Sequence, residues 1–333
     1  MKIIKPSATL MEHNISPYEF IEKVGRTCYK SEEYIKEGSA EKFVANLVKS
    51  EHMAMLEHEH IYIVTTPQFM NDFLGDMQER NITLKYFNVT HTFKINIISG
   101  SFRSFYDLFK ECYSSLPLEY MKKIITTKYP VVFGDYVSKS DLSKYSSEDC
   151  DILSRDEFIE AFALFFPGVL SKHLIHTFLF VCDRGVTHEF VRHRPASFAQ
   201  ESTRYCNYSK DKFGNEITVI LPCFFDTGMG VMSNSFVYDT WKHSCEVAER
   251  DYFKLLELGA KPQEARTVLP HSLKTELILT ATEDEWKHIV NLRYLGTTGA
   301  PHPQIKEVMG LALEDLERTT DGRVSVCVMK IKK

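Results

Sequence analysis

Helix-like and strand-like segments follow one another along this chain without a regular strand–helix–strand alternation. Alternate positions from Phe87 to Ile97 carry mostly apolar side chains, the period of a strand with one buried face. Further strands are predicted at 58–66, 173–183, 216–222 and 275–281. Helices are predicted at 16–29, 40–50, 101–112, 155–166, 186–194, 236–258, 262–270, 283–294 and 303–319. This order predicts an α+β fold with a mixed, mainly antiparallel sheet flanked by helices.

Two local signals support this assignment. Ser16, Pro17 and Glu19 form a predicted capping box with proline in the first helical turn. The segment 140–151, SDLSKYSSEDCD, is polar and is expected to be an exposed loop. No linker or repeat divides the 333 residues, so we expect a single domain.

The charge balance excludes one broad class of function. The chain has 40 basic and 45 acidic residues, a net charge of −5, which disfavours a general nucleic-acid binder. We see no leader, no run of membrane-spanning length and no paired cysteine motif among the eight cysteines. A cytoplasmic protein with reduced thiols and no membrane partner is the expectation.

The segment from Val191 to Tyr205, VRHRPASFAQESTRY, combines cations with small hydroxyl and amide side chains. Arginine holds phosphate or carboxylate through two parallel hydrogen bonds, and hydroxyl groups complete the remaining acceptor positions. Pro195 is expected to end the preceding helix, which makes 197–204 a predicted loop. The whole pattern indicates an anion-binding loop. The RHR triplet alone has an alternative interpretation, in which its cations interact with the dipole of the helix end and bind no ligand.

Arg293 is predicted on the apolar face of a helix that starts at Thr282, with Glu285 as the partner in a capping box. A cation on such a face is costly unless an anionic or strongly accepting partner meets it. The alternative is an arginine at a frayed helix end that reaches water. Arg266 lies shortly before Pro270, and its position alone does not indicate a binding site.

Histidine and cysteine offer two further candidates. His58 and His60 would point to the same side of a strand, near His52, which is compatible with a metal. No neighbouring residue completes an evident ligand set, so we expect no metal site. Cys206 lies two residues after Arg204 and is a candidate thiolate nucleophile. The alternative is that Cys206 is a small buried side chain that only fills space in the core. The absence of a spacing pattern among the eight cysteines favours this alternative.

Together these residues resemble the flavin-dependent thymidylate synthases. RHRPASFAQES fits that family's pattern of Arg-His-Arg followed after seven residues by serine, here Ser202. HMAMLEHEHIYI resembles its His-x5-His segment, EARTVLP its segment with a substrate-binding arginine, and NLR at 291–293 its segment with the arginine that polarises uracil. Four segments in the family's order, over residues 52–293, make the resemblance specific.

The resemblance implies an enzyme that methylates C5 of dUMP to give dTMP, with 5,10-methylenetetrahydrofolate as carbon donor. Bound FAD, reduced by NADPH, would supply the hydride. The implied protein has a mixed α/β fold and is a homotetramer with active sites shared between subunits. Nucleic acid is not an expected partner. The chain would be one catalytic domain, 1–333, with an insert at about 65–170 that the family usually lacks.

The resemblance also assigns site residues by position. FAD would meet His52, Ala54, Arg192, His193, Arg194, Gln200, Thr282 and His288. The dUMP would meet Glu189, Arg192, Gln200, Glu201, Ser202, Thr203, Arg204, Arg266 and Arg293. Arg293 is the implied catalytic residue, because a guanidinium at a uracil carbonyl or N3 stabilises charge that develops on the ring. No protein nucleophile adds to the ring in this family, which argues against Cys206 and makes Ser202 a ligand.

Five positions depart from the family's usual residues. They are Gln200 for glutamate, Ala199 for asparagine, Glu189 for glutamine, Ala54 for a hydroxyl residue and His288 for asparagine. A diverged flavoprotein that acts on another nucleotide is therefore one alternative function. A non-catalytic nucleic-acid-binding module built on the basic loop is another, which the net charge disfavours.

Overall fold

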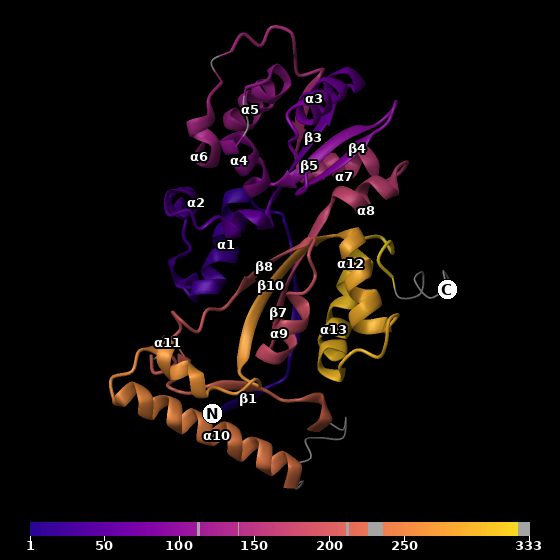
Figure 1. Ribbon diagram of the computed structural model, residues 1–333. Helices are drawn as coiled ribbons and strands as arrows, with labels where there is room; N and C mark the ends of the chain where they lie inside the picture. The colour runs from indigo at the N-terminus through magenta and orange to yellow at the C-terminus, as the bar shows by residue number, and fades with distance from the viewer. Residues whose placement is uncertain (112–113, 139, 211–212, 226–235, 326–333) are drawn as a thin grey trace. The chain divides into compact units, whose positions relative to one another are not determined.

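The computed structural model describes residues 1–111, 114–138, 140–210, 213–225 and 236–325 (Figure 1). The chain forms two compact units. The first consists of Met1–Met11, Gly25–Glu33 and His176–Lys333, and the second of Glu12–Val24 and Tyr34–Ile175. The segment 65–170 belongs entirely to the second unit. That the whole chain works as one catalytic domain stays a prediction.

A four-stranded sheet organises the first unit. Its order is β2 (Ser7–Met11), β7 (Ile175–Asp183), β10 (Lys274–Thr282) and β8 (Ala196–Gln200). The pairs β2–β7 and β8–β10 are antiparallel, and Gln200 lies opposite Leu277. A separate two-stranded parallel sheet joins β1 (Lys2–Ile4) to β9 (Thr218–Ile220). This arrangement puts the end of β8, and the residues that follow it, beside β10.

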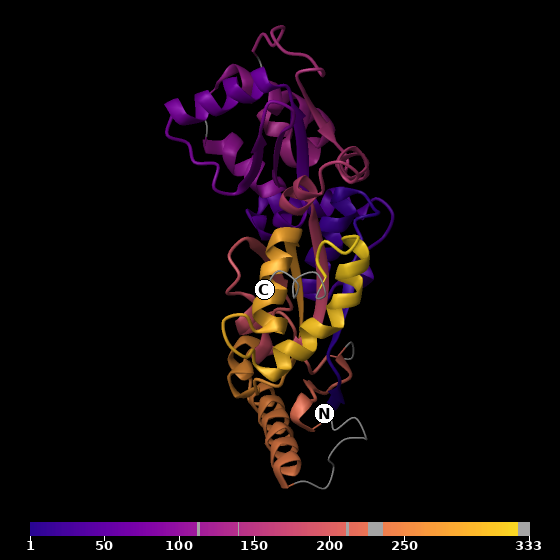
Figure 2. The ribbon, with the colours of Figure 1, turned by 90° about the vertical axis from the view of Figure 1, so that its right-hand side faces the viewer.

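The helices of the first unit are α9 (Arg184–Phe190), α10 (Phe236–Glu257), α11 (Pro262–Ala265), α12 (Glu283–Val290) and α13 (Pro303–Thr319). Short 3-10 helices lie at Cys223–Phe225 and Arg266–Val268, and a π-helical turn at Asn291–Leu295 extends α12. Figure 2 shows α12 and α13 side by side, as does Figure 1. Their apolar faces share one core with β7 and β10.

Trp286 is the largest side chain in this core. It is fully buried, its ring lies 5.2 Å from that of Phe178, and its Nε1 donates to the carbonyl of His176 at 3.0 Å. Full burial of a large apolar side chain contributes roughly 1.5–3 kcal/mol. Because Trp286 follows Glu285 directly, its packing fixes the first turn of α12 against the sheet.

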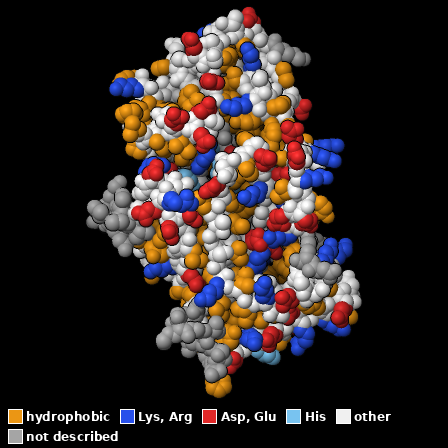
Figure 3. All heavy atoms as spheres, turned by 180° about the vertical axis from the view of Figure 1, so that it is seen from behind, with side chains coloured by type: hydrophobic (Ala, Val, Ile, Leu, Met, Phe, Trp, Pro, Cys, Tyr) orange, Lys and Arg blue, Asp and Glu red, His pale blue; other side chains and the backbone are white. Residues whose placement is uncertain are grey.

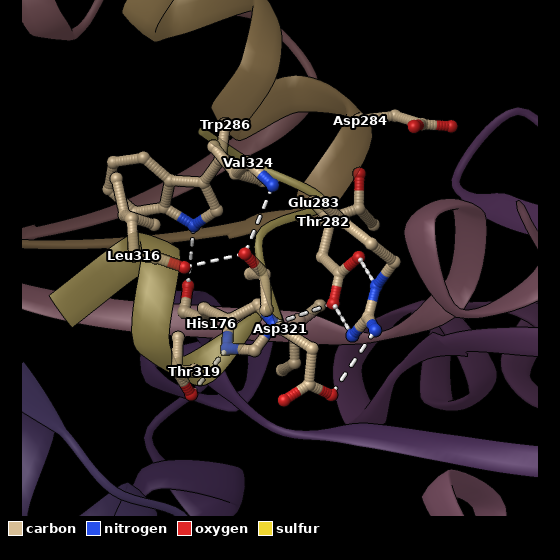
Figure 4. Close-up of polar contacts among 12 residues, drawn as sticks. His176, Thr282, Glu283, Asp284, Trp286, Leu316, Thr319, Asp321 and Val324 are labelled. Carbon is tan, nitrogen blue, oxygen red and sulfur yellow. Dashed lines mark hydrogen bonds and ion pairs between the residues drawn. The ribbon is translucent and has the colours of Figure 1, made fainter. Parts of the chain in front are cut away.

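A buried polar network ties the start of α12 to the segment after α13. Glu283 is fully buried; it accepts from Arg323 Nε and Nη2 at 2.8 and 2.9 Å, and its Oε1 lies 3.1 Å from His176 Nε2 (Figure 4). Burial alone would raise the pKa of the Glu283 carboxyl, but these hydrogen bonds and the nearby charges lower it to about 2. Asp284 points away from this network.

The second unit contains another four-stranded sheet, in which every pair is antiparallel. Its order is β4 (Phe87–His91), β5 (Asn96–Ser101), β3 (His60–Thr65) and β6 (Cys150–Leu153). The α-helices are α1 (Pro17–Tyr29), whose last residues belong to the first unit, α2 (Ser39–Lys49), α3 (Pro67–Glu79), α4 (Phe102–Glu111), α5 (Leu116–Lys128), α6 (Pro130–Phe133), α7 (Arg155–Phe162) and α8 (Pro167–His173). The 3-10 helices are Met53–His58 and Gly134–Tyr136, and a further one, Glu32–Tyr34, begins in the first unit and ends in the second. Buried phenylalanines, among them Phe69, Phe73 and Phe102, fill its core.

The α+β class and most predicted helices and strands are confirmed. The capping box of α1 is present, because Ser16 N donates to Glu19 Oε2 at 3.0 Å and Glu19 N donates to Ser16 Oγ at 3.3 Å. No helix in the described ranges is both long and apolar enough to cross a membrane. The prediction did not separate the strands into two four-stranded sheets, because pairing depends on contacts distant in sequence.

The single strand predicted from the alternation between Phe87 and Ile97 is wrong: the hairpin β4–β5 occupies these residues. Thr92 Oγ1 accepts from Lys94 N at 3.2 Å and Ile95 N at 2.8 Å, which closes a turn and leaves Phe93 exposed. Phe87 lies opposite Gly100, where a Cβ would come within 2.7 Å of the Phe87 ring, so any side chain there would force this ring to move. The alternation ends at the turn, because all six residues of β5 are buried.

Three smaller expectations also differ from the structure. The first part of the predicted loop 197–204 is strand β8, which pairs with β10. His58 ends a 3-10 helix, and the strand begins only at His60, so the strand spacing of these histidines does not apply. The polar segment 140–151 buries Leu142 and Tyr145, so it is not wholly exposed.

Candidate functional site

The Arg-His-Arg triplet follows the end of α9 at Phe190. His193 is buried, at 5% exposure, whereas Arg192 and Arg194 on either side are exposed. Among the described residues, no carboxylate lies within ion-pair distance of Arg192 or Arg194. The triplet therefore has a buried imidazole as its anchor and two guanidinium groups whose donors are available to an anionic ligand.

A chain of hydrogen bonds runs through His193. Arg293 Nε donates to His193 Nε2 at 3.1 Å, and His193 Nδ1 lies 3.0 Å from Glu285 Oε1. A guanidinium has only donors, so Nε2 must be the acceptor. The neutral ring therefore carries its proton on Nδ1 and donates it to Glu285. Glu285 and Arg293 together select one tautomer of His193.

Arg293 lies in the π-helical turn at Asn291–Leu295 rather than in a regular α-helix. Its Nη1 donates to Glu189 Oε2 at 3.2 Å and its Nη2 to the Glu189 carbonyl at 2.8 Å. The sequence predicted that Arg293 would need an accepting partner. The Glu189 carboxylate is one such partner, and it belongs to the protein itself. Of the five guanidinium N–H groups, three are used in these contacts, which leaves one on each Nη for a ligand.

The residues after β8 bring Arg266 to the predicted anion loop. Arg266 Nη1 donates to Thr203 Oγ1 at 3.1 Å, and Ser202 N donates to the carbonyl of Cys28 at 3.1 Å. Arg204 N lies 3.4 Å from Ser202 Oγ, and the exposed Arg204 guanidinium lies over the ring of Tyr205 at 5.7 Å. The structure therefore places Ser202, Thr203 and Arg204 in one loop, with the Arg266 guanidinium against it from the 3-10 helix Arg266–Val268.

Gln200 and Glu201 are engaged within the protein. Gln200 Nε2 donates to Thr187 Oγ1 and Thr275 Oγ1, each at 3.2 Å. Glu201 is 2% exposed, and its Oε2 accepts from Lys274 Nζ at 3.0 Å. Their predicted roles as FAD and dUMP ligands stay predictions, since these side-chain contacts already occupy part of their hydrogen-bonding capacity.

A cavity of about 600 Å³ lies beside Glu201 and is lined by charged side chains. Lys30 and Lys274 both pair with Glu276 at its wall. Burial alone would raise the pKa of the Glu276 carboxyl, but the two lysines lower it. These cations are thus balanced by carboxylates of the protein.

Thr282 and His288 flank the first turns of α12. Thr282 Oγ1 accepts from Glu285 N at 3.4 Å, so the predicted N-cap is confirmed. The Glu285 carboxylate, however, contacts His193 rather than completing a capping box. His288 is exposed, and its ring lies 5.6 Å from that of His193. Of the predicted flavin residues, His193, Thr282 and His288 are thereby brought together.

His52 and Ala54 belong to the second unit, where both are exposed. Their predicted position at the flavin stays a prediction. Cys206 is 1% exposed and forms no disulfide, and neither do Cys28, Cys150, Cys182, Cys223 and Cys245. Burial is the environment expected of a filler rather than of a reactive thiolate. The remaining two cysteines, Cys112 and Cys327, lie outside the described residues.

The sequence reasoning missed the role of Glu285 and the contacts of Thr187 and Lys274. Glu285 was interpreted only as a capping residue. The sequence did hold one signal for a role in the site. Glu285 and His288 are three residues apart, which places them on one face of α12. Thr187 and Lys274 gave no local signal, because their partners come from other elements.

On the face of the molecule shown in Figure 3, basic and acidic side chains are interspersed. Among the described residues drawn there, lysines and arginines are mixed with aspartates and glutamates rather than gathered in one broad positive surface.

The chain is similar to several proteins named flavin-dependent thymidylate synthase. The relative from Pyrococcus furiosus is 30% identical over 142 residues, which are 43% of this chain and 54% of that protein. The relative from Thermococcus onnurineus is 30% identical over 123 residues, 37% of this chain and 47% of that protein. The chain spans about half the length of the curated relatives it matches.

A crystal structure of a UMP/dUMP methylase, PolB from Streptomyces cacaoi bound with 5-Br dUMP, aligns with 98% of this chain and 100% of that chain. The sequence identity is 16% and the TM-score is 0.40. The sequence model of the family described as thymidylate synthase complementing protein matches residues 135–320, more than half of the chain. This chain belongs to the thymidylate synthase complementing protein family.

Proposed function

We propose that this protein methylates C5 of dUMP to form dTMP, with 5,10-methylenetetrahydrofolate as carbon donor, FAD as cofactor and NADPH as reductant. The observation that carries the proposal is the hydrogen bond between Arg293 and His193. It joins the arginine assigned to the pyrimidine to the histidine assigned to the flavin, so both predicted ligands would meet at one place. The family match and the names of the relatives support the same reaction.

Arg293 is suited to activate the pyrimidine. Glu189 and His193 fix the plane of its guanidinium and leave two N–H groups that can donate to a uracil carbonyl oxygen and to a deprotonated N3. Donors fixed in this way stabilise the negative charge that develops on the ring as C5 attacks, and they need no reorganisation. Ser202, Arg204 and Arg266 lie in or against one loop and would hold the 5′-phosphate through charge-assisted hydrogen bonds.

The flavin-assigned residues fit FAD by their chemistry. Arg192 and Arg194 are exposed and lack carboxylate partners among the described residues, which suits an anionic pyrophosphate. Reduced FAD would supply the hydride that completes the methyl group. His193 cannot turn freely between these arginines, because Glu285 and Arg293 hold its ring from both sides. We include in the proposal a homotetramer with shared active sites, in which His52 and Ala54 would also reach the flavin.

A related nucleotide as the preferred substrate is the second candidate function. The observation that favours it is Gln200, whose amide donates to Thr187 and Thr275 where the resembled family usually has glutamate. A neutral amide committed to protein hydroxyls would contact a ligand differently from a carboxylate. The pyrimidine or sugar specificity could change as a result.

The test starts from purified full-length protein saturated with FAD. We expect flavin absorbance that stays with the protein through gel filtration and is perturbed by dUMP. With NADPH and methylenetetrahydrofolate, dUMP should give dTMP, whereas UMP and dCMP serve as competing substrates. Methylation of UMP or dCMP in preference to dUMP would support the second candidate. A protein that takes up no FAD at micromolar concentration would contradict both. Light scattering of the same sample tests the tetramer.

A further inference from the structure

Three side chains with metal-binding chemistry converge next to Arg293. The ligand atoms of His193, Glu285 and His288 all lie within 4.8 Å of one another. Glu285 and His288 come from adjacent turns of α12, and His193 comes from the segment after α9. His193 Nδ1 and Glu285 Oε1 are only 3.0 Å apart, and both residues are buried.

We propose that His193, Glu285 and His288 bind a divalent transition-metal ion, with zinc as the ion to test. Imidazole nitrogen and carboxylate oxygen are established zinc ligands, and three protein ligands leave a position for water. Ligand atoms about 2.0–2.2 Å from one ion are separated by roughly 3–3.5 Å. The His193–Glu285 pair already has this separation. His288 is exposed, so a change of its side-chain rotamer can close the remaining gap.

Binding of the ion requires a proton shift on His193. In the present arrangement Nδ1 donates to Glu285 and Nε2 accepts from Arg293. A metal ion at Nδ1 replaces the proton there, and the neutral ring then carries its proton on Nε2. Nε2 can no longer accept from Arg293, because both atoms would now be donors.

The electrostatic effect of the ion also weakens the hydrogen bond between Arg293 and His193, as the proton shift does. The ion adds two positive charges near the Arg293 guanidinium, whereas Glu285 supplies one negative charge at the cluster. Metal binding and the His193–Arg293 hydrogen bond are therefore antagonistic. This linkage gives the site an unusual signature, since removing a cation that is not a ligand should strengthen metal binding.

The experiment is a calorimetric titration of the chelator-treated full-length protein with zinc chloride, with metal content measured after gel filtration. We expect one zinc ion per chain at this site. Glu285→Gln and His288→Asn should each weaken the binding at least 10-fold. Arg293→Met should tighten it about 3- to 10-fold, because the hydrogen bond to Nε2 no longer has to be broken.

A matched control is available on α10, where His243 and Glu246 also stand three residues apart on a helix. His243→Asn with Glu246→Gln should leave the measured affinity unchanged. His288 is exposed, so His288→Asn tests the site without disturbing the core. Zinc affinity within 2-fold of wild type in His288→Asn, or weaker binding in Arg293→Met, would overturn the proposal. His193 and His288 are also assigned to FAD, so the titration uses protein without flavin, and its outcome is read separately from the tests of FAD uptake and methylation.

Discussion

Arg293 Nε donates a hydrogen bond to His193 Nε2 across 3.1 Å, although the two residues are one hundred positions apart in the chain. The contact orients both groups: Arg293 is held in one plane, and His193 is held in the tautomer that donates to Glu285. A site built in this way is organised before any ligand arrives. Changes to Arg293 should therefore affect a chemical step more than they affect the fold.

Arg293→Lys keeps the charge but loses the planar fork that can donate to a uracil carbonyl oxygen and a deprotonated N3 together. If Arg293 stabilises charge that develops on the pyrimidine, the methylation rate should fall by about 10²-fold or more. Flavin reduction by NADPH should change much less, since that half-reaction does not need the pyrimidine. The measurement pairs single-turnover flavin reduction with dTMP formed per reduced flavin.

Cys206→Ala provides the contrast to that change. Cys206 is buried and no thiolate attack is expected, so this variant should keep most of its methylation activity. Loss of methylation in Cys206→Ala together with normal methylation in Arg293→Lys would require a covalent mechanism instead.

Arg204→Ala should weaken dUMP binding by about 10- to 100-fold, the effect of losing a charge-assisted hydrogen bond worth roughly 1.5–3 kcal/mol. Arg204 is exposed and has no carboxylate partner among the described residues, so the change should not disturb packing. Equilibrium binding of dUMP and of deoxyuridine to both proteins is the measurement. Deoxyuridine, which lacks the phosphate, should bind both equally weakly. A similar fold-loss for deoxyuridine would show that the arginine acts elsewhere.

The second unit should lose stability on mild acidification because of His173. This ring is fully buried between Thr90 Oγ1 and Ser99 Oγ, each at 2.8 Å, and burial lowers its pKa to about 3. The unfolded chain binds the proton near pH 6.5 and the folded chain does not. Stability is therefore intact above pH 6.5 and is lost as the pH falls towards 3, by at most about 1.4 kcal/mol per pH unit for this residue.

Urea unfolding between pH 7 and pH 5, above the range in which most carboxylates titrate, measures this slope. His173→Gln should flatten it. Thr90→Val removes one hydrogen bond but keeps the histidine, so it should lower stability throughout and retain most of the slope. A wild-type slope in His173→Gln would assign the acid sensitivity to other groups, of which His60 is one, because burial also lowers its pKa to about 3.

Arg323→Ala should cost about 3–5 kcal/mol of unfolding free energy, because it leaves the fully buried Glu283 carboxylate without its main cationic partner. Asp321→Asn is the control: Asp321 is exposed, its contact with Arg323 is long at 3.4 Å, and asparagine tolerates the positive φ of 46° there. The control should change stability by less than about 0.5 kcal/mol. Thermal or urea unfolding with equal losses in both variants would argue against the buried pair.

Short-range patterns in the sequence determined most helices and strands, because a cap or an apolar period needs only nearby residues. Ser16 and Glu19 illustrate this, as their capping box is present. The same patterns failed at the β4–β5 turn and at β8. There the outcome depends on Thr92 closing a turn and on pairing with β10.

Only the tertiary structure decided what the site residues contact. Glu285 meets His193 across 92 positions, Gln200 meets Thr275 across 75, and Glu201 meets Lys274 across 73. None of these pairs has a spacing that a helix or a strand would bring together. They are neighbours because β8 pairs with β10 and because α12 begins where β10 ends, and the packing of a sheet and its helices is a property of the whole unit.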